Sequence, residues 1–71
     1  MSLAKMKRGN RVTIVSLKAD RAYEERLAAL GLFPGAQVEV LRNSNGGEVI
    51  LGCFDSRFAI GRELASAIEV A

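Results

Sequence analysis

The sequence contains no histidine, no tryptophan and a single cysteine among its 71 residues. Histidine is the commonest general base near neutral pH, so the serines have no imidazole to activate them. The carboxylates are scattered and form no spaced pair suited to acid and base roles. Gly46-Gly47 lacks the Gly-Lys-Ser/Thr ending that a phosphate-binding P-loop requires. We therefore expect that the protein is not an enzyme.

The same shortage limits metal binding, because soft transition metals favour thiolate and imidazole ligands. We expect no cofactor and no metal site; the only candidate ligand set is a weak, open one of Cys53 with Asp55 or Glu48. Cys53 ends a predicted strand that carries Val49 and Leu51 on the same face, which favours a buried small hydrophobe. A lone cysteine cannot form an internal disulfide, and this favours a reducing cytosol.

Long apolar runs are also missing. No run approaches the roughly 18 residues of a membrane span, and the N-terminus has no apolar core of secretory length. We therefore expect a cytoplasmic protein that does not insert into a membrane. Seventy-one residues predict one domain over residues 1–71, with a core at about 5–70.

Nucleic acid binding by a small barrel needs a basic groove and aromatic platforms. The net charge is only +2, although residues 1–21 carry six basic side chains against one acidic. The aromatic residues are few, and we expect Tyr23 and Phe58 in the core and Phe33 partly exposed. Nucleic acid is therefore not an expected partner, and a small RNA-binding barrel is kept as an alternative.

What is present is a series of short β-branched and apolar runs separated by turn residues, which is typical of a small barrel or sandwich. Val12 and Ile14 share one face of the first run, while Val15 and Leu17 share the other, which indicates burial on both sides or a bulge. The loop between the second and third strands is predicted at Asn43–Gly47. The five predicted strands are Arg11–Leu17, Gln37–Arg42, Glu48–Cys53, a strand around Phe58–Ile60, and Ile68–Val70.

One short helix is predicted between the first two strands. Tyr23, Leu27 and Leu30 fall at i, i+4 and i+7 and predict one apolar stripe. Asp20 is placed to cap the first turn, and Gly31 to end the helix in the left-handed conformation.

The chain then turns sharply toward the second strand. Leu32 is expected to fold back on Leu27, and Pro34-Gly35 to form the centre of a type II turn. A further helical turn is predicted over Gly61–Ala67, before the last strand.

Arg26–Gly35, the closing run Phe58–Val70 and Gly9 together resemble the ferrous iron transport protein A (FeoA) family. The resemblance implies a mainly β, SH3-like barrel, a fold also found at the C-terminus of diphtheria-toxin-repressor-type iron regulators. Two places depart from the family pattern. Asn43–Glu48 replaces a proline-rich loop, and Gly61 takes the first of two basic positions and leaves only Arg62.

The resemblance implies a cytosolic accessory protein of bacterial ferrous iron uptake. Its implied partner is the GTP-binding membrane ferrous iron transporter, which would hold it at the inner face of the membrane; transition metal binding is also described for the family. A stand-alone repressor-type domain that binds a peptide or a metal regulator is an alternative, and a weak homo-oligomer is left open. The predicted contact residues are Leu32, Phe33 and Pro34 on one surface, and Arg57 and Arg62 with the Asn43–Gly47 loop on another.

Overall fold

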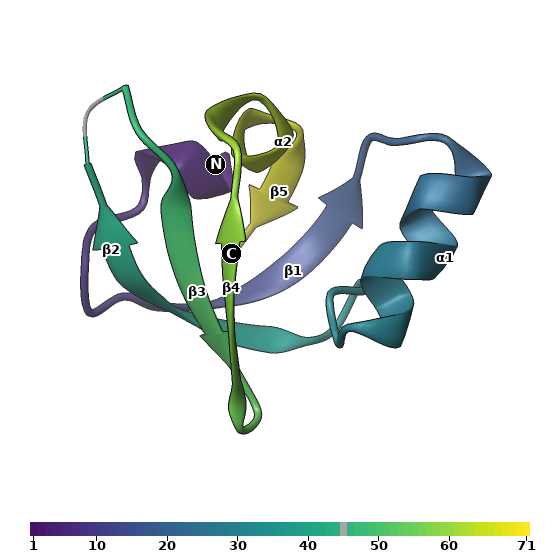
Figure 1. The fold of residues 1–71 in the computed structure, drawn as a ribbon, viewed down its shortest axis with the longest axis horizontal. Coiled ribbons are helices and arrows are strands. Elements are labelled where there is room, and N and C mark those ends of the chain that lie inside the picture. The colour runs from purple at the N-terminus through teal and green to yellow at the C-terminus, as the bar shows by residue number, and fades with distance from the viewer. Residues whose placement is uncertain (45) are drawn as a thin grey trace.

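The computed structural model describes residues 1–44 and 46–71, and its elements follow the predicted order (Figure 1). A short 3₁₀ helix, η1, comes first and was not predicted. The elements in chain order are η1 (Leu3–Lys5), β1 (Arg11–Leu17), α1 (Arg21–Ala29), β2 (Gln37–Asn43), β3 (Val49–Cys53), β4 (Ser56–Ile60), α2 (Arg62–Ser66) and β5 (Ile68–Val70).

The five strands form one antiparallel sheet in the order β4-β3-β2-β1-β5. The pairing of β1 with β5 shifts register between Ile14 and Ser16, so the predicted bulge is confirmed at Val15. The bulge turns Val15 outward, while Val12 and Ile14 stay buried. Figure 1 shows that the sheet curves, with α2 next to the edge strand β5 and α1 beyond the end of β1.

The core lies inside this curve and is apolar, with no buried polar or charged side chain among the residues that the structure describes. Strand alternation works as predicted in β2, where Val38 and Val40 are buried, and in β3, where Val49, Leu51 and Cys53 are buried. Each of these strands therefore contributes one apolar face.

Both ends of α1 match the predicted capping. The Asp20 carboxylate accepts a 2.8 Å hydrogen bond from the Tyr23 amide. At the other end, Gly31 has φ +97°, its amide donates to the Ala28 carbonyl, and the Leu32 amide donates to the Leu27 carbonyl. These two bonds form a Schellman motif.

The turn that follows α1 is also as predicted. The Ala36 amide donates to the Phe33 carbonyl at 3.0 Å, and Gly35 has φ +95°, as a type II turn requires.

The predicted apolar stripe on α1 is wrong in two of its three positions. Only Leu27 is buried, while Tyr23 is 40% exposed and Leu30 is 51% exposed. The caps and Leu27 thus attach a helix that stands off the sheet. The i, i+4, i+7 spacing identified the helix, but it could not show that only Leu27 of the stripe reaches the core.

The loop before β3 differs from its predicted bounds, and the turn after β3 is very short. Asn43 is the last residue of β2, so the loop before β3 starts one residue later than predicted. Asn45, part of the predicted loop, lies outside the described residues. The turn from β3 to β4 has only two residues, and the first, Phe54, has φ +56°.

Candidate docking surface

Two of the three predicted contact residues after α1 are exposed, and one is not. Leu32 is fully buried and packs in the core, so its side chain is not available to a partner. Phe33 is 38% exposed. Phe33 and Pro34 line a hollow of about 460 Å³ between α1 and the end of β1. The burial of Leu32 follows from the Schellman motif, which turns the residue after Gly31 back over the helix.

Arg62 is occupied by contacts within the chain. Its Nε donates to the Gly47 carbonyl at 3.1 Å, and its Nη2 donates to the Ser44 carbonyl at 2.6 Å and to Asn43 Oδ1. A longer bond of 3.4 Å joins Nη1 to the Ala4 carbonyl. The planar guanidinium therefore fastens the start of α2 to the β2–β3 loop and to η1.

Asn43 completes this network from the other side. Its amide nitrogen donates to the carbonyl oxygens of Ala4 at 2.9 Å and Met6 at 2.6 Å, while its oxygen accepts from Arg62. The side chains of Asn43 and Arg62 thus hold together three segments that are distant in the sequence. This arrangement assigns Arg62 a positioning role and leaves little of its donor capacity for a partner.

Arg57 lies at the opposite end of β4 from Arg62. It pairs with Gly52 beside the β3–β4 turn, while Arg62 follows the other end of the strand. The predicted surface of Arg57 and Arg62 with the Asn43–Gly47 loop is therefore not one patch. Arg57 instead lines two small hollows that Glu39 borders, and a larger hollow of about 510 Å³ that it shares with α1.

This hollow, which we call the α1–β4 groove, runs between α1 and β4. Tyr23, Arg26 and Leu30 line it from the helix. Phe58 and Ala59 line it from the strand. Buried Leu27, Leu32 and Ile60 also line it. A second hollow of about 490 Å³ continues it past Tyr23, Gly61 and Leu64.

Sequence reasoning missed the apolar side chains that this end of the molecule exposes. Phe54 is 83% exposed, and its ring lies against Gly31, whose added Cβ would be 3.1 Å from Phe54 Cε2. A phenylalanine with positive φ is strained by about 1–3 kcal/mol, a cost often found at functional positions. The two-residue Phe54-Asp55 turn was the signal that could have identified it.

The donor chemistry does not fit a resident metal ion. Cys53 is 2% exposed, and its thiol donates to the Gly31 carbonyl at 3.5 Å. Burial raises the pKa of this thiol, so it stays protonated at neutral pH. Asp55 lies in the exposed turn and Glu48 precedes β3. Among residues 1–44 and 46–71, no three His, Cys, Asp or Glu side chains are grouped to hold a metal ion.

Burial of Cys53 leads to a measurable expectation. With Ellman's reagent at pH 7, the native thiol should react about 100-fold more slowly than in denaturant, because only a transient opening exposes the thiolate. The protonated form is favoured in the folded state. The stability that the protonated Cys53 thiol contributes is therefore fully present at pH below its pKa in the unfolded chain. That stability is lost as the pH rises through the raised pKa of the folded state. Equal rates in the native and denatured chain would contradict this burial.

No helix in the described part of the chain is both long and apolar enough to span a membrane.

Comparison with known proteins supplies the family. The FeoA domain family model matches residues 1–71. A Methanocaldococcus jannaschii protein, named as an Fe(2+) transport protein A, is 38% identical over 68 residues, which are 96% of this chain and 82% of the relative. The solution structure of a Chlorobium tepidum FeoA protein is 34% identical, with TM-score 0.88, over 99% of this chain and 68% of that one.

A more distant match supports the fold. The crystal structure of Stenotrophomonas maltophilia FeoA, described as a procaryotic SH3 domain protein and complexed with zinc, superimposes with TM-score 0.82. It is 22% identical and covers 100% of this chain and 89% of that one. At this identity the likeness shows the fold alone, and that fold is the predicted SH3-like one.

Proposed function

The chain belongs to the FeoA domain family, and from that premise we propose that it is a cytoplasmic accessory protein of ferrous iron uptake. It acts by contact with the GTP-binding membrane ferrous iron transporter, whose cytoplasmic face recruits it to the membrane. It regulates transport or GTP turnover without a reactive centre of its own. Ferrous iron is the cargo of the transporter and needs no ligand from this chain.

The observation that carries this proposal is the exposed apolar surface beside α1. A nine-residue helix with one buried side chain leaves Tyr23 and Leu30 uncovered, and a hollow lies on each side of it. In small domains such uncovered aromatic and aliphatic side chains are suited to anchor a protein partner. The chain has no histidine and its thiol is buried, so contact is a better use of this surface than catalysis.

The contact residues that we propose are Phe33 and Pro34 on one side of α1 and Arg57 on the other. Phe33 offers an aromatic anchor, and Arg57 offers a guanidinium that has no ion pair among the described residues. Arg62 is not among them, because its guanidinium is engaged by the β2–β3 loop and η1.

Co-purification with the tagged transporter from detergent-solubilised membranes tests the proposal. We expect the parent chain to be recovered with the transporter, and both Phe33→Ala and Arg57→Ala to lower recovery at least about fivefold, as loss of an interface anchor does. Val15→Ala is the matched control, because Val15 is also an exposed apolar residue and lines none of these hollows.

Two results would contradict the proposal. One is recovery of both variants at the parent level. The other is association that weakens steeply with salt and disappears after nuclease treatment, which would indicate the RNA-binding alternative.

A further inference from the structure

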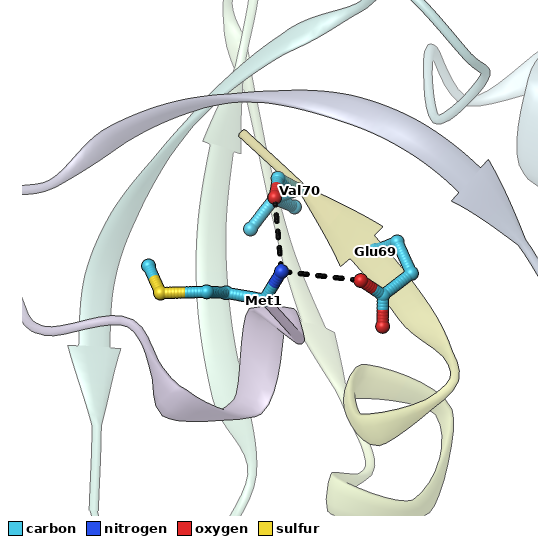
Figure 2. A network of polar contacts seen from close by, with 3 residues as sticks. All are labelled: Met1, Glu69 and Val70. Atoms are coloured by element: carbon cyan, nitrogen blue, oxygen red, sulfur yellow. Dashed lines mark hydrogen bonds and ion pairs between the residues drawn. The ribbon is translucent and has the colours of Figure 1, made fainter.

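The two edges of the sheet are treated differently by the chain. At the β5 edge, Met1 of the N-terminal segment lies against Glu69 and Val70 (Figure 2). Ser2 forms an isolated β-bridge with Glu69. The Val70 amide donates to the Met1 carbonyl at 2.8 Å, and the Met1 amino group lies 3.1 Å from the Glu69 carboxylate. The chain therefore covers this edge itself.

At the other edge, no segment within the described part of the chain pairs with the free side of β4. Cys53 and Ser56 flank the two-residue turn, so each donates a backbone hydrogen bond to the other. Every second pair along the ladder repeats this pattern, namely Leu51–Phe58 and Val49–Ile60. Alternation along the ladder then turns the backbone N–H and C=O of Arg57 and Ala59 away from β3.

The next ladder supports this assignment. The Val40 carbonyl accepts from the Gly9 amide and the Val40 amide donates to the Asn10 carbonyl, so the backbone groups of Val40 point away from β3. The hydrogen-bonded pair between β2 and β3 is therefore Glu39 and Gly52. The backbone groups of Leu51 then point toward β4. Among the described residues, no backbone bond outside the β3–β4 ladder engages Arg57 or Ala59. Two donors and two acceptors therefore stand free along one side of β4.

Proteins usually protect such an edge with proline, lysine, a bulge or a covering segment. β4 reads Ser-Arg-Phe-Ala-Ile and pairs with β3 in unbroken register, so its protection is limited to its short length and the charge of Arg57, with no proline or bulge. The free side opens into the α1–β4 groove, because Arg57, Phe58, Ala59 and Ile60 all line that hollow. The edge thus faces a space bounded by a helix.

The chemistry of the groove selects what can enter it. Its charged lining is Arg26 and Arg57, with no acidic side chain, and neither arginine has an ion pair among the described residues. Its apolar lining includes the exposed Tyr23 and Leu30 on the helix side. A strand added to β4 would place one of its residues opposite Arg57, on the same face of the sheet and with the two Cα atoms about 5.5 Å apart. The residues before and after it in the added strand would lie on the apolar face.

We propose that β4 is a docking edge for an extended segment of a protein partner, in which a glutamate or aspartate opposite Arg57 stands between two apolar residues. The segment pairs with the free N–H and C=O groups of Arg57 and Ala59. Its apolar side chains cover Leu30 and Tyr23, and its carboxylate binds Arg57 and Arg26. This inference rests on the proposed function, since it names the kind of segment through which the partner is recognised.

A peptide titration tests the proposal on the full chain. The probe is the acetylated, amidated heptapeptide Ser-Val-Glu-Val-Thr-Val-Ser, and the control probe carries lysine in place of glutamate. We expect the glutamate peptide to shift the amide resonances of Arg57 and Ala59, and to bind at least tenfold more tightly than the lysine peptide. The peptide amides form two alternate sets, and only one set faces β4. N-methylation of that set should abolish binding, while N-methylation of the other set should not.

Variants of the chain separate the two parts of the recognition. Arg57→Gln should remove most of the preference for glutamate, while Arg21→Gln, on the other side of α1, should keep it. Ala59→Pro removes one outward N–H at an edge position that tolerates proline, and should weaken binding at least tenfold.

The outcomes distinguish this inference from the proposed function. Shifts confined to residues outside the groove, equal sensitivity to N-methylation in both registers, or no binding would overturn the docking edge. Self-association through β4 that the peptide does not displace would also overturn it, because a second copy would then be the occupant. Co-purification with the transporter that survives Ala59→Pro would leave the proposed function standing without this edge.

Discussion

Replacement of Arg62 by alanine is expected to lower the free energy of unfolding by about 2 kcal/mol. In a domain of this size that corresponds to a fall in melting temperature of roughly 8–16 °C. Thermal and urea unfolding followed by far-ultraviolet circular dichroism measure both quantities. Arg62 makes four hydrogen bonds from α2 to two other segments, so its loss affects the β2–β3 loop, η1 and α2 together.

The cost arises from the acceptors that remain. Without the guanidinium, the carbonyl oxygens of Gly47 and Ser44 and the side-chain oxygen of Asn43 lose a charged donor. Hydrogen bonds to charged groups contribute about 1.5–3 kcal/mol each, but water can replace part of them at this half-buried site. An effect near the lower end of that range for the whole network is therefore expected.

Two further variants make the result specific. Arg57→Ala removes an arginine that makes no ion pair with any residue in 1–44 or 46–71, and should change the melting temperature by less than about 3 °C. Arg62→Lys keeps the charge but not the planar fork, so it should recover less than half of the lost stability. Equal effects of the two alanine substitutions would show that the network contributes nothing particular.

The local signals in the sequence were sufficient for most of the fold. Capping by Asp20 and Gly31, the Pro34-Gly35 turn and the alternation in β2 and β3 depend on interactions within a few residues, and each is present in the structure. The resemblance to the FeoA family then supplied the barrel that these elements form. Local chemistry predicted the elements, and the family predicted their assembly.

The candidate site was harder to predict because it depends on contacts between distant segments. Spacing alone placed Tyr23 and Leu30 in the core, but the sheet covers only Leu27. Arg57 and Arg62 are five positions apart in the sequence, yet they lie at opposite ends of β4. No periodicity in the sequence shows that Arg62 reaches the loop at Gly47, and this changes its expected role from partner contact to internal support.

Gly31→Ala is the second change with a large expected effect, a loss of about 2–4 kcal/mol in unfolding free energy. Gly31 has φ +97°, where an L-residue costs roughly 1–2 kcal/mol. The added methyl would also lie 3.1 Å from the Cys53 sulfur and 3.1 Å from Phe54 Cε2, so these two side chains must shift by a few tenths of an ångström. Urea unfolding measures the loss, and the amide resonances of Cys53 and Phe54 report the displacement.

Gly35→Ala separates the backbone cost from the contact cost. Gly35 has nearly the same φ, +95°, but a Cβ there would meet no atom within 4 Å. This variant should therefore lose only about 1–2 kcal/mol and leave the Phe54 resonance in place. The difference between the two variants measures how tightly the end of α1 packs on the β3–β4 turn. If both variants lose the same stability and neither moves Phe54, that packing is absent and the exposed ring is not held over Gly31.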